Sequence, residues 1–386
     1  MKLQKKLLRV LSTSYFIAAL CYAEQAVVVK PVVDLIGSPI AEFFPNLETT
    51  KAYEEIPLCG AQRNAWNNCP RLHQLLFNEV IEVLEEKNNE VKIKVPDIFY
   101  INCQGKEKHN VFWTLKNNLK TFSHLNKIGI NTIQFPGLQT KQNTITLVKP
   151  FAVLKTGTTY SAGTRFVVEQ ISDTNAIACI YNPELNVIEK TIIPRSFFVV
   201  SGKCPQQKMD LFVNIVKNWS NAQYIPYVWG GCSFVTTHEK AFESDGKSFG
   251  RSSCAAIKNG FDCAGLVLRA AKIAGLDYPY KNTTTLKEFL PALTNTDVVK
   301  NGDLIWIPGH VMIVSDAHRN KLIEARSYPH GYGIVHEIEL EKVFKDIKTF
   351  AQLLSASTEK KLLYRLDDAQ QIRDTIKECR LLRLDK

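Results

Sequence analysis

Three residues in the second half of the chain have the types that a cysteine hydrolase uses. They are Cys263, His310 and Glu324, in that order along the sequence. A thiolate attacks a carbonyl carbon, an imidazole takes the thiol proton and returns it to the leaving group, and a carboxylate fixes the imidazole tautomer. Each residue also has an ordinary structural interpretation, as a packed cysteine, a histidine at a strand edge and a solvated glutamate. The surrounding elements decide between the two interpretations.

The sequence around the cysteine predicts a helix with the thiol at its N-terminal end. Small and apolar residues recur at helical spacing between Phe261 and Leu276, and Gly275 is a natural C-terminal stop. Asp262 and Cys263 then occupy the first turn, where the helix dipole and the backbone N–H groups favour a thiolate. We therefore expect the pKa of Cys263 to be lowered.

The histidine and the glutamate lie in two consecutive predicted strands. His310 opens HVMIVSD, Glu324 lies in KLIEARS, and residues 316–320 between them are polar enough to turn. Antiparallel pairing would place position 310 opposite 326 and 312 opposite 324, which makes His310 and Glu324 diagonal neighbours on one face. Three further histidines are rival bases: His318, His330 and His336.

The N-terminus has the layout of a secretory signal peptide. Basic side chains precede an apolar run over residues 10–20, and a cleavage site follows at Ala23. The run is too short to span a membrane, and no later segment reaches the required length. We therefore expect a mature protein that is secreted to the periplasm or cell envelope. Its formal net charge falls from +10 to about +6 on cleavage, and no basic motif indicates a nucleic-acid partner.

The remaining cysteines are compatible with disulfides in an oxidising compartment. Cys59 with Cys69 and Cys232 with Cys254 are the local pairs to test first. The sequence contains no CxxC spacing, which argues against a structural zinc site.

The hydrophobic pattern divides the chain into segments. Residues 24–200 are rich in short strands, with a hairpin within 72–95 and a helical or irregular link over 112–125. An amphipathic helix over 206–222 opens the part that holds the three chemical residues. The expected organisation is a signal peptide (1–23), a first small β-domain with linker (24–140), a second one (141–204), a catalytic domain (205–350) and a partly helical C-terminal extension (351–386).

Five short motifs carry a resemblance to a known family. PYVWGG, FDCAGLVLRAAKIAGL, NGDLIWI, GHVMIV and LIEA follow one another in the order seen in NlpC-type cell-wall cysteine peptidases, over about residues 206–344. The resemblance implies an α+β fold with a papain-like core, in which the cysteine helix packs on an antiparallel sheet. It also implies that Cys263 is the nucleophile, His310 the general base and Glu324 the orienting residue, at a position where this family often has histidine.

The front half resembles the bacterial SH3-like domain that precedes NlpC-type domains in murein-peptide endopeptidases, which implies one or two small β-barrels ahead of the catalytic domain. PVVDLIGSP and LLFNEVIEVLEE carry this resemblance, and residues 143–200 match a second such domain more loosely. In such relatives the SH3-like domain narrows the cleft and selects peptides with a free N-terminal L-alanine, and the enzyme cuts the bond after γ-D-glutamate. The implied substrates are peptidoglycan stem peptides.

Three positions depart from the family pattern. Ala264 follows the cysteine where the family usually has serine, and the insertion 232–260 is longer than the usual link. Thr284 lies where relatives carry a substrate-binding serine. By resemblance, Tyr227 lines the active site near the oxyanion. The candidate oxyanion or substrate-binding residues are therefore Tyr227, Asp262 and Thr284.

We expect a secreted, monomeric cysteine endopeptidase that acts on murein peptides and needs no metal or other cofactor. Two alternatives remain open: an amidase or acyltransferase on the same core, and a non-catalytic wall-binding protein with a decayed site. Ala264 favours the wall-binding alternative, whereas a retained cysteine, histidine and acid argue against it.

Overall fold

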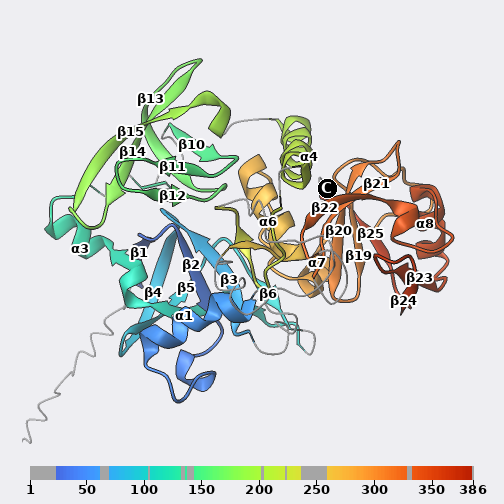
Figure 1. The fold of residues 1–386 in the computed structure, drawn as a ribbon, viewed down its shortest axis with the longest axis horizontal. Helices are drawn as coiled ribbons and strands as arrows, with labels where there is room; N and C mark the ends of the chain where they lie inside the picture. The colour runs from blue at the N-terminus through green and yellow to red at the C-terminus, as the bar shows by residue number, and fades with distance from the viewer. Residues whose placement is uncertain are drawn as a thin grey trace, which may run out of the picture.

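The chain folds into two β-rich units and a mixed α and β unit (Figure 1). The computed structural model describes residues 23–60, 69–102, 105–131, 135–136, 143–200, 204–221, 224–235, 259–327 and 333–384, with the side chains of 58–60 excepted. The expected signal peptide up to residue 22 and most of the insertion 232–260 lie outside these ranges. Within them, no helix is long and apolar enough to cross a membrane.

The first β unit is a seven-stranded sheet in the order β3-β2-β8-β5-β4-β1-β9. Alternating apolar residues bury one face of each strand; in β5, for example, Val91 and Ile93 are buried. The hairpin predicted within 72–95 is confirmed, because β4 pairs with β5 through a turn at Asn88, whose φ is 55°. The strands are β1 (Glu24–Val28), β2 (Val32–Ile36), β3 (Arg71–Leu76), β4 (Val80–Lys87), β5 (Glu90–Lys94), β8 (Val111–Leu115) and β9 (Leu119–Thr121).

The prediction of a helical or irregular link over residues 112–125 is wrong. These residues form most of β8, all of β9 and the start of helix α3 (Phe122–Lys127). Helix α1 (Thr49–Gly60) and the short pair β6 (Tyr100–Ile101) and β7 (Lys108–His109) complete this unit. The hydrogen-bonded order runs from β3 to β9 without a described pairing between these two edges, so the described strands form no closed barrel.

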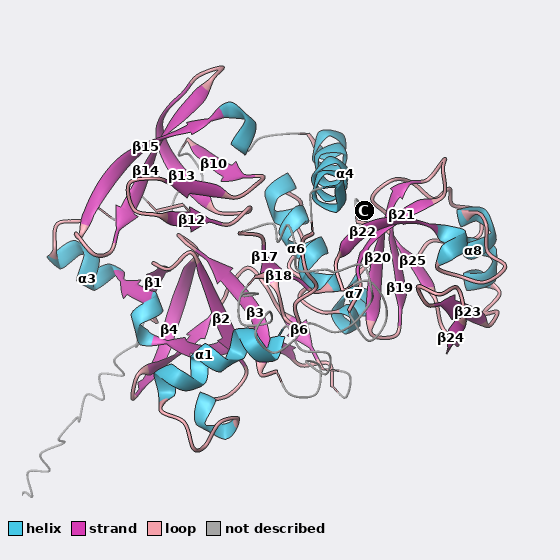
Figure 2. Cartoon of the chain, viewed as in Figure 1, coloured by secondary structure: helices cyan, strands magenta, loops and turns pink. Residues whose placement is uncertain are grey.

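The second β unit is built almost entirely of strands (Figure 2). Five of them pair in the order β15-β14-β13-β10-β16, and β11 pairs with β12 separately. A core that includes Phe77, Phe166 and Tyr181 joins this unit to the first one. Its strands are β10 (Thr144–Leu147), β11 (Phe151–Val153), β12 (Thr158–Tyr160), β13 (Arg165–Ile171), β14 (Asn175–Asn182), β15 (Val187–Pro194) and β16 (Phe198–Val200).

The third unit has a five-stranded antiparallel sheet in the order β22-β21-β20-β19-β25. Helices α4 (Pro205–Asn221) and α6 (Cys263–Ala274) pack on one face, and α8 (Phe350–Thr358) packs on the other. The amphipathic helix predicted over 206–222 is α4. The other elements are β17 (Cys232–Ser233), β18 (Gly260–Phe261), α7 (Thr283–Phe289), β19 (Leu304–Ile307), β20 (His310–Asp316), β21 (Lys321–Ala325), β22 (Val335–Glu339), β23 (Leu363–Leu366), β24 (Ile372–Ile376) and β25 (Arg380–Leu382).

The C-terminal residues are part of this sheet. Strand β25 pairs with β19, with Leu382 opposite Leu304. Helix α8 agrees with the predicted helical content of the tail, but the expectation of an extension did not anticipate β23, β24 and β25. The tail therefore covers and widens the sheet that carries His310 and Glu324.

Candidate active site

The cysteine lies at the N-terminus of α6, as the sequence predicts. Asp262 is the N-cap, and its carboxylate accepts a hydrogen bond from the N–H of Gly265. Gly275 ends the helix in the left-handed conformation, with φ 74°. Cys263 is therefore the first helical residue, and its side chain is 8% exposed.

Close packing against the WGG turn fixes the start of this helix. A Cβ added to Gly265 would lie 2.0 Å from the carbonyl oxygen of Gly231, so no side chain fits there. We predict that Gly265→Ala destabilises the protein by about 1–3 kcal/mol, because the backbone must shift to relieve the overlap. Urea unfolding measures this change. The matched control is Gly105→Ala, where an added Cβ has no neighbour within 4 Å, and equal stability of the two variants would contradict the packing.

The strands bring His310 and Glu324 together. Ile313 pairs with Ile323 in β20 and β21, which is the predicted register. The Nε2 atom of His310 lies 2.7 Å from Oε2 of Glu324, and the glutamate side chain is fully buried. With Nε2–H donating to this carboxylate, Nδ1 is the ring nitrogen that carries the lone pair.

The thiol of Cys263 meets the same end of β20. It accepts hydrogen bonds from the backbone N–H groups of Val311 and Ala264, so it lies beside the residue that follows His310. Tyr227 is also close to the thiol. Burial, and after it the electrostatic effects of Cys263 and Asp262, raise the pKa of the Tyr227 hydroxyl. The thiol of Cys263, the backbone N–H that follows His310, and Tyr227 thus lie close together on α6, β20 and the WGG segment.

The expected lowering of the thiol pKa is wrong. Burial, and after it the neighbouring Asp262 carboxylate, raise the pKa of Cys263 to about 12. The backbone N–H groups and Lys281 act in the opposite direction but do not prevail. The resting thiol is therefore protonated at neutral pH, and a base must remove its proton during attack.

Burial also shifts His310, toward its neutral form. Desolvation and the nearby Arg365 charge lower the pKa of His310 to about 4, although Glu324 opposes them. A neutral imidazole is the form that accepts a proton. We predict that kcat/KM stays constant as the pH is lowered from neutral. It should fall as the pH passes through about 4, because His310 then becomes protonated. A pH–rate profile with circular dichroism as a folding control measures this, and an acidic limb near the ordinary histidine value of 6.5 would contradict it.

The remaining candidate residues are distributed around the cysteine helix. Asp262 lies 3.4 Å from the Nζ atom of Lys281, a buried lysine just before α7. Thr284 is half-buried in the first turn of α7, and no contact joins it to the thiol among the described interactions. Its neighbour Thr285 is the buried one, and its hydroxyl accepts from the N–H of Ile101 in the first β unit.

The two rival histidines within the described residues differ in their distance from the candidate site. His318 is exposed in the turn between β20 and β21, and His330 lies outside the described residues. His336 is opposite Glu324 in β22, with its Nε2 atom 3.4 Å from Oε1 of that carboxylate. His336 therefore shares the acid with His310.

Two arginines at the site were not found from the sequence. Arg365 in β23 donates to Oε2 of Glu324 at 2.6 Å, and Nη1 of Arg326 lies 3.8 Å from Oε1. Although burial alone would raise it, Arg365 and the two histidines hold the pKa of Glu324 well below its usual value. Only the alternation in LYRL could have indicated a buried arginine, and nothing local links it to Glu324.

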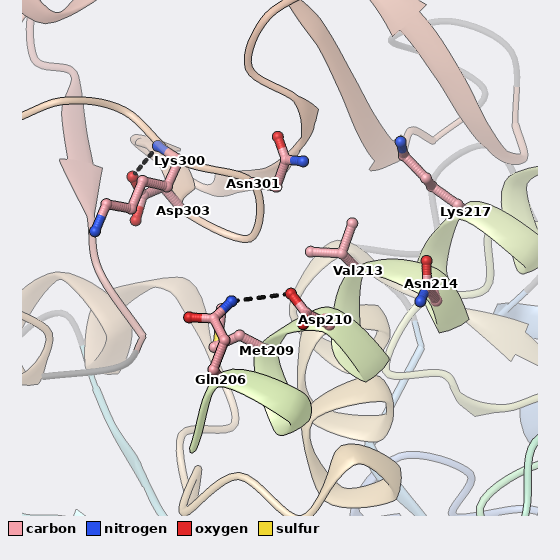
Figure 3. A pocket seen from close by; sticks show the side chains of 9 residues that line it. All are labelled: Gln206, Met209, Asp210, Val213, Asn214, Lys217, Lys300, Asn301 and Asp303. Atoms are coloured by element: carbon pink, nitrogen blue, oxygen red, sulfur yellow. Dashed lines mark hydrogen bonds between the residues drawn. The ribbon is translucent and has the colours of Figure 1, made fainter. Parts of the chain in front are cut away.

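A cavity of about 590 Å³ lies between α4 and the loop before β19 (Figure 3). Asp210 accepts from Gln206 at 2.9 Å, and Asp303 accepts from the backbone of Lys300 and from Arg383. The lining includes none of the three chemical residues, so this cavity is separate from the candidate active site.

In each of the two predicted disulfide pairs, one cysteine side chain lies outside the described residues. The side chain of Cys59 and all of Cys254 lie outside the described residues. Cys232 is buried, and its thiol donates to the carbonyl of Gly265 in α6.

One comparison with known proteins shows a shared fold. No model of a protein family matches the sequence, and no curated protein does. A crystal structure of an NlpC/P60 family protein from Bacillus cereus matches with a TM-score of 0.53 and 15% identity, over 82% of this chain and 94% of that chain. The peptidoglycan hydrolase RipB from Mycobacterium tuberculosis matches with a TM-score of 0.24 and 25% identity, over 36% of this chain and 66% of that chain. By fold, the chain is similar to an NlpC/P60 family protein over most of its length.

Proposed function

We propose that the chain is a cysteine peptidase that hydrolyses peptidoglycan stem peptides. The observation that carries the proposal is the buried His310–Glu324 pair at the end of β20, where the next backbone N–H contacts the Cys263 thiol. The fold shared with an NlpC/P60 protein and the motif order in the sequence support the same chemistry.

His310 takes the thiol proton as Cys263 attacks the amide carbonyl, and it later gives this proton to the leaving amine. Glu324 keeps the imidazole oriented through the 2.7 Å hydrogen bond and stabilises the imidazolium that forms. The backbone N–H of Cys263, at the first helical position, and the Tyr227 hydroxyl are the proposed oxyanion donors. A well-placed donor of this kind contributes about 3 kcal/mol to transition-state stabilisation.

The bond proposed for cleavage follows γ-D-glutamate, between it and the L-diamino acid. This proposal rests on the resemblance to murein-peptide endopeptidases. The first β unit, proposed to be SH3-like, is well placed to shape the substrate cleft. Phe99 forms a bridge with Tyr280, and the side chain of Asn282 donates to the carbonyl of Ile101, so this unit contacts the segment that precedes α7.

The proposed site of action is the periplasm or cell envelope. The basic and apolar N-terminal segment, which has the layout of a signal peptide, supports this location.

Mass spectrometry of defined muropeptides tests the proposal. The protein is incubated with stem peptides that carry either a free or a blocked N-terminal L-alanine. Release of L-alanyl-γ-D-glutamate from the free peptide alone is the expected result. Release of the whole stem peptide from its sugar would instead show an amidase, and wall binding without any cleavage would show the non-catalytic alternative.

A further inference from the structure

The tail strand β23 supplies an arginine that acts on the catalytic histidine through its acid. Arg365 is 5% exposed, and its Nη2 atom lies 2.6 Å from Oε2 of Glu324. The same oxygen lies 2.7 Å from Nε2 of His310. The buried Oε2 atom of Glu324 therefore lies within hydrogen-bond distance of both Arg365 and His310.

A second contact, made by a residue next to β21, holds the strand that carries Arg365. Arg326, just after β21, donates from Nη2 to the backbone carbonyl of Leu366 at 2.7 Å. Arg365 in β23 reaches Glu324 in β21, and Arg326 beside β21 reaches β23. These two reciprocal contacts hold the tail against the catalytic sheet at the level of Glu324.

The buried negative charge of Glu324 needs cations or donors around it. A fully buried carboxylate is costly unless cations or hydrogen-bond donors surround it. The groups that face Glu324 come from each neighbouring strand: His310 from β20, Arg326 after β21, His336 from β22 and Arg365 from β23. Of the two arginines, Arg365 is closer to the carboxylate and shares the oxygen that His310 uses.

We infer that Arg365 is a positioning residue for His310: its guanidinium fixes the Glu324 carboxylate oxygen that bonds the imidazole, and its charge keeps the imidazole in the form that accepts the thiol proton. This inference rests on the proposed role of His310 as the base. Arg365 does not contact the reacting atoms; it acts through Glu324.

Removal of the charge should make His310 easier to protonate. The positive charge of Arg365 disfavours a second positive charge on the imidazole, and desolvation acts in the same direction. In Arg365→Gln the histidine pKa should rise toward its ordinary value, so the base is lost at a higher pH. A change that merely weakens folding gives no such shift, because it leaves the titration of the remaining folded protein unchanged.

The test compares Arg365→Gln, Arg365→Lys and Arg380→Gln in the full chain. Arg380 is the matched control, because it lies on the same tail in β25 and pairs with Glu378 rather than Glu324. NMR titration of carbon-13-labelled histidine, with His310 assigned from a His310→Gln variant, follows the imidazole directly. Kinetics with the stem peptide at several pH values give kcat and KM.

For Arg365→Gln we expect kcat to fall about 10- to 100-fold with little change in KM, and the acidic limb to move to higher pH. Arg365→Lys should fold and keep the wild-type His310 titration because it keeps the charge, but its kcat should fall because it lacks the guanidinium that holds the Glu324 carboxylate. Arg380→Gln should match the wild type. A folded Arg365→Gln protein with the wild-type His310 titration and kcat would overturn the inference. If Arg365→Gln does not fold, a wild-type kcat in Arg365→Lys, which lacks the guanidinium contact with Glu324, would overturn it as well.

Failure of the proposed function gives a different pattern. If the wild type cleaves no stem peptide, the proposed substrate is wrong, but the His310 titration still reports whether Arg365 controls the imidazole. If the wild type cleaves and Glu324→Gln loses activity while Arg365→Gln does not, the function stands and the inference about Arg365 fails.

Discussion

Replacement of Cys263 by alanine is expected to reduce the cleavage of stem peptides about a million-fold. In the proposed mechanism the thiol is the group that attacks the carbonyl, and alanine at this position keeps the small buried volume at the start of α6. Steady-state rates with purified protein measure the loss. The fold should survive, because the Asp262 cap and the Gly265–Gly231 contact do not involve the thiol.

The matched control for this variant is Cys204→Ala. Cys204 is an exposed cysteine just before α4, outside the candidate active site. We expect it to retain wild-type activity. Full activity in Cys263→Ala, or an equal loss in both variants, would contradict the assignment of the nucleophile.

His310→Ala is the second variant with a large expected effect, again a loss of about a million-fold. Burial raises the pKa of the Cys263 thiol to about 12, so very little thiolate exists at neutral pH without a base. Loss of the imidazole also leaves the Glu324 carboxylate without its 2.7 Å partner. Rates measured from pH 6 to 10 should rise steadily with pH, because hydroxide then replaces the missing base.

His318→Ala is the control for the histidine. It removes an imidazole from the turn between the same two strands, but its side chain is exposed. Wild-type kinetics are expected. If His336→Ala abolished activity while His310→Ala did not, the roles of the two histidines that share Glu324 would be reversed.

The elements that carry the chemistry could be predicted because their signals are local. Asp262 before a small apolar helix and Gly275 after it mark α6, and the alternating strands on either side of the 316–320 turn set the register of β20 and β21. The contact between His310 and Glu324 follows from that register alone. Long-range placement of the thiol beside Val311 could be expected only through the resemblance.

Features that depend on distant packing could not be predicted. The helix N-terminus is a local signal and predicts a lowered thiol pKa, whereas burial is a tertiary effect that raises it. Strand β8 lies mostly within the predicted link, and it forms by pairing with β5 and β2. Arg365 reaches Glu324 across 41 positions of sequence, and no local pattern encodes that contact.

The central claim is that Cys263 cleaves peptidoglycan stem peptides. Its most direct test is mass spectrometry of the tripeptide L-alanyl-γ-D-glutamyl-diaminopimelate after incubation with the wild type and with Cys263→Ala in parallel. We predict L-alanyl-γ-D-glutamate and free diaminopimelate with the wild type, and the intact tripeptide with the variant. Equal turnover by the two proteins, or an intact tripeptide with both, would contradict the claim.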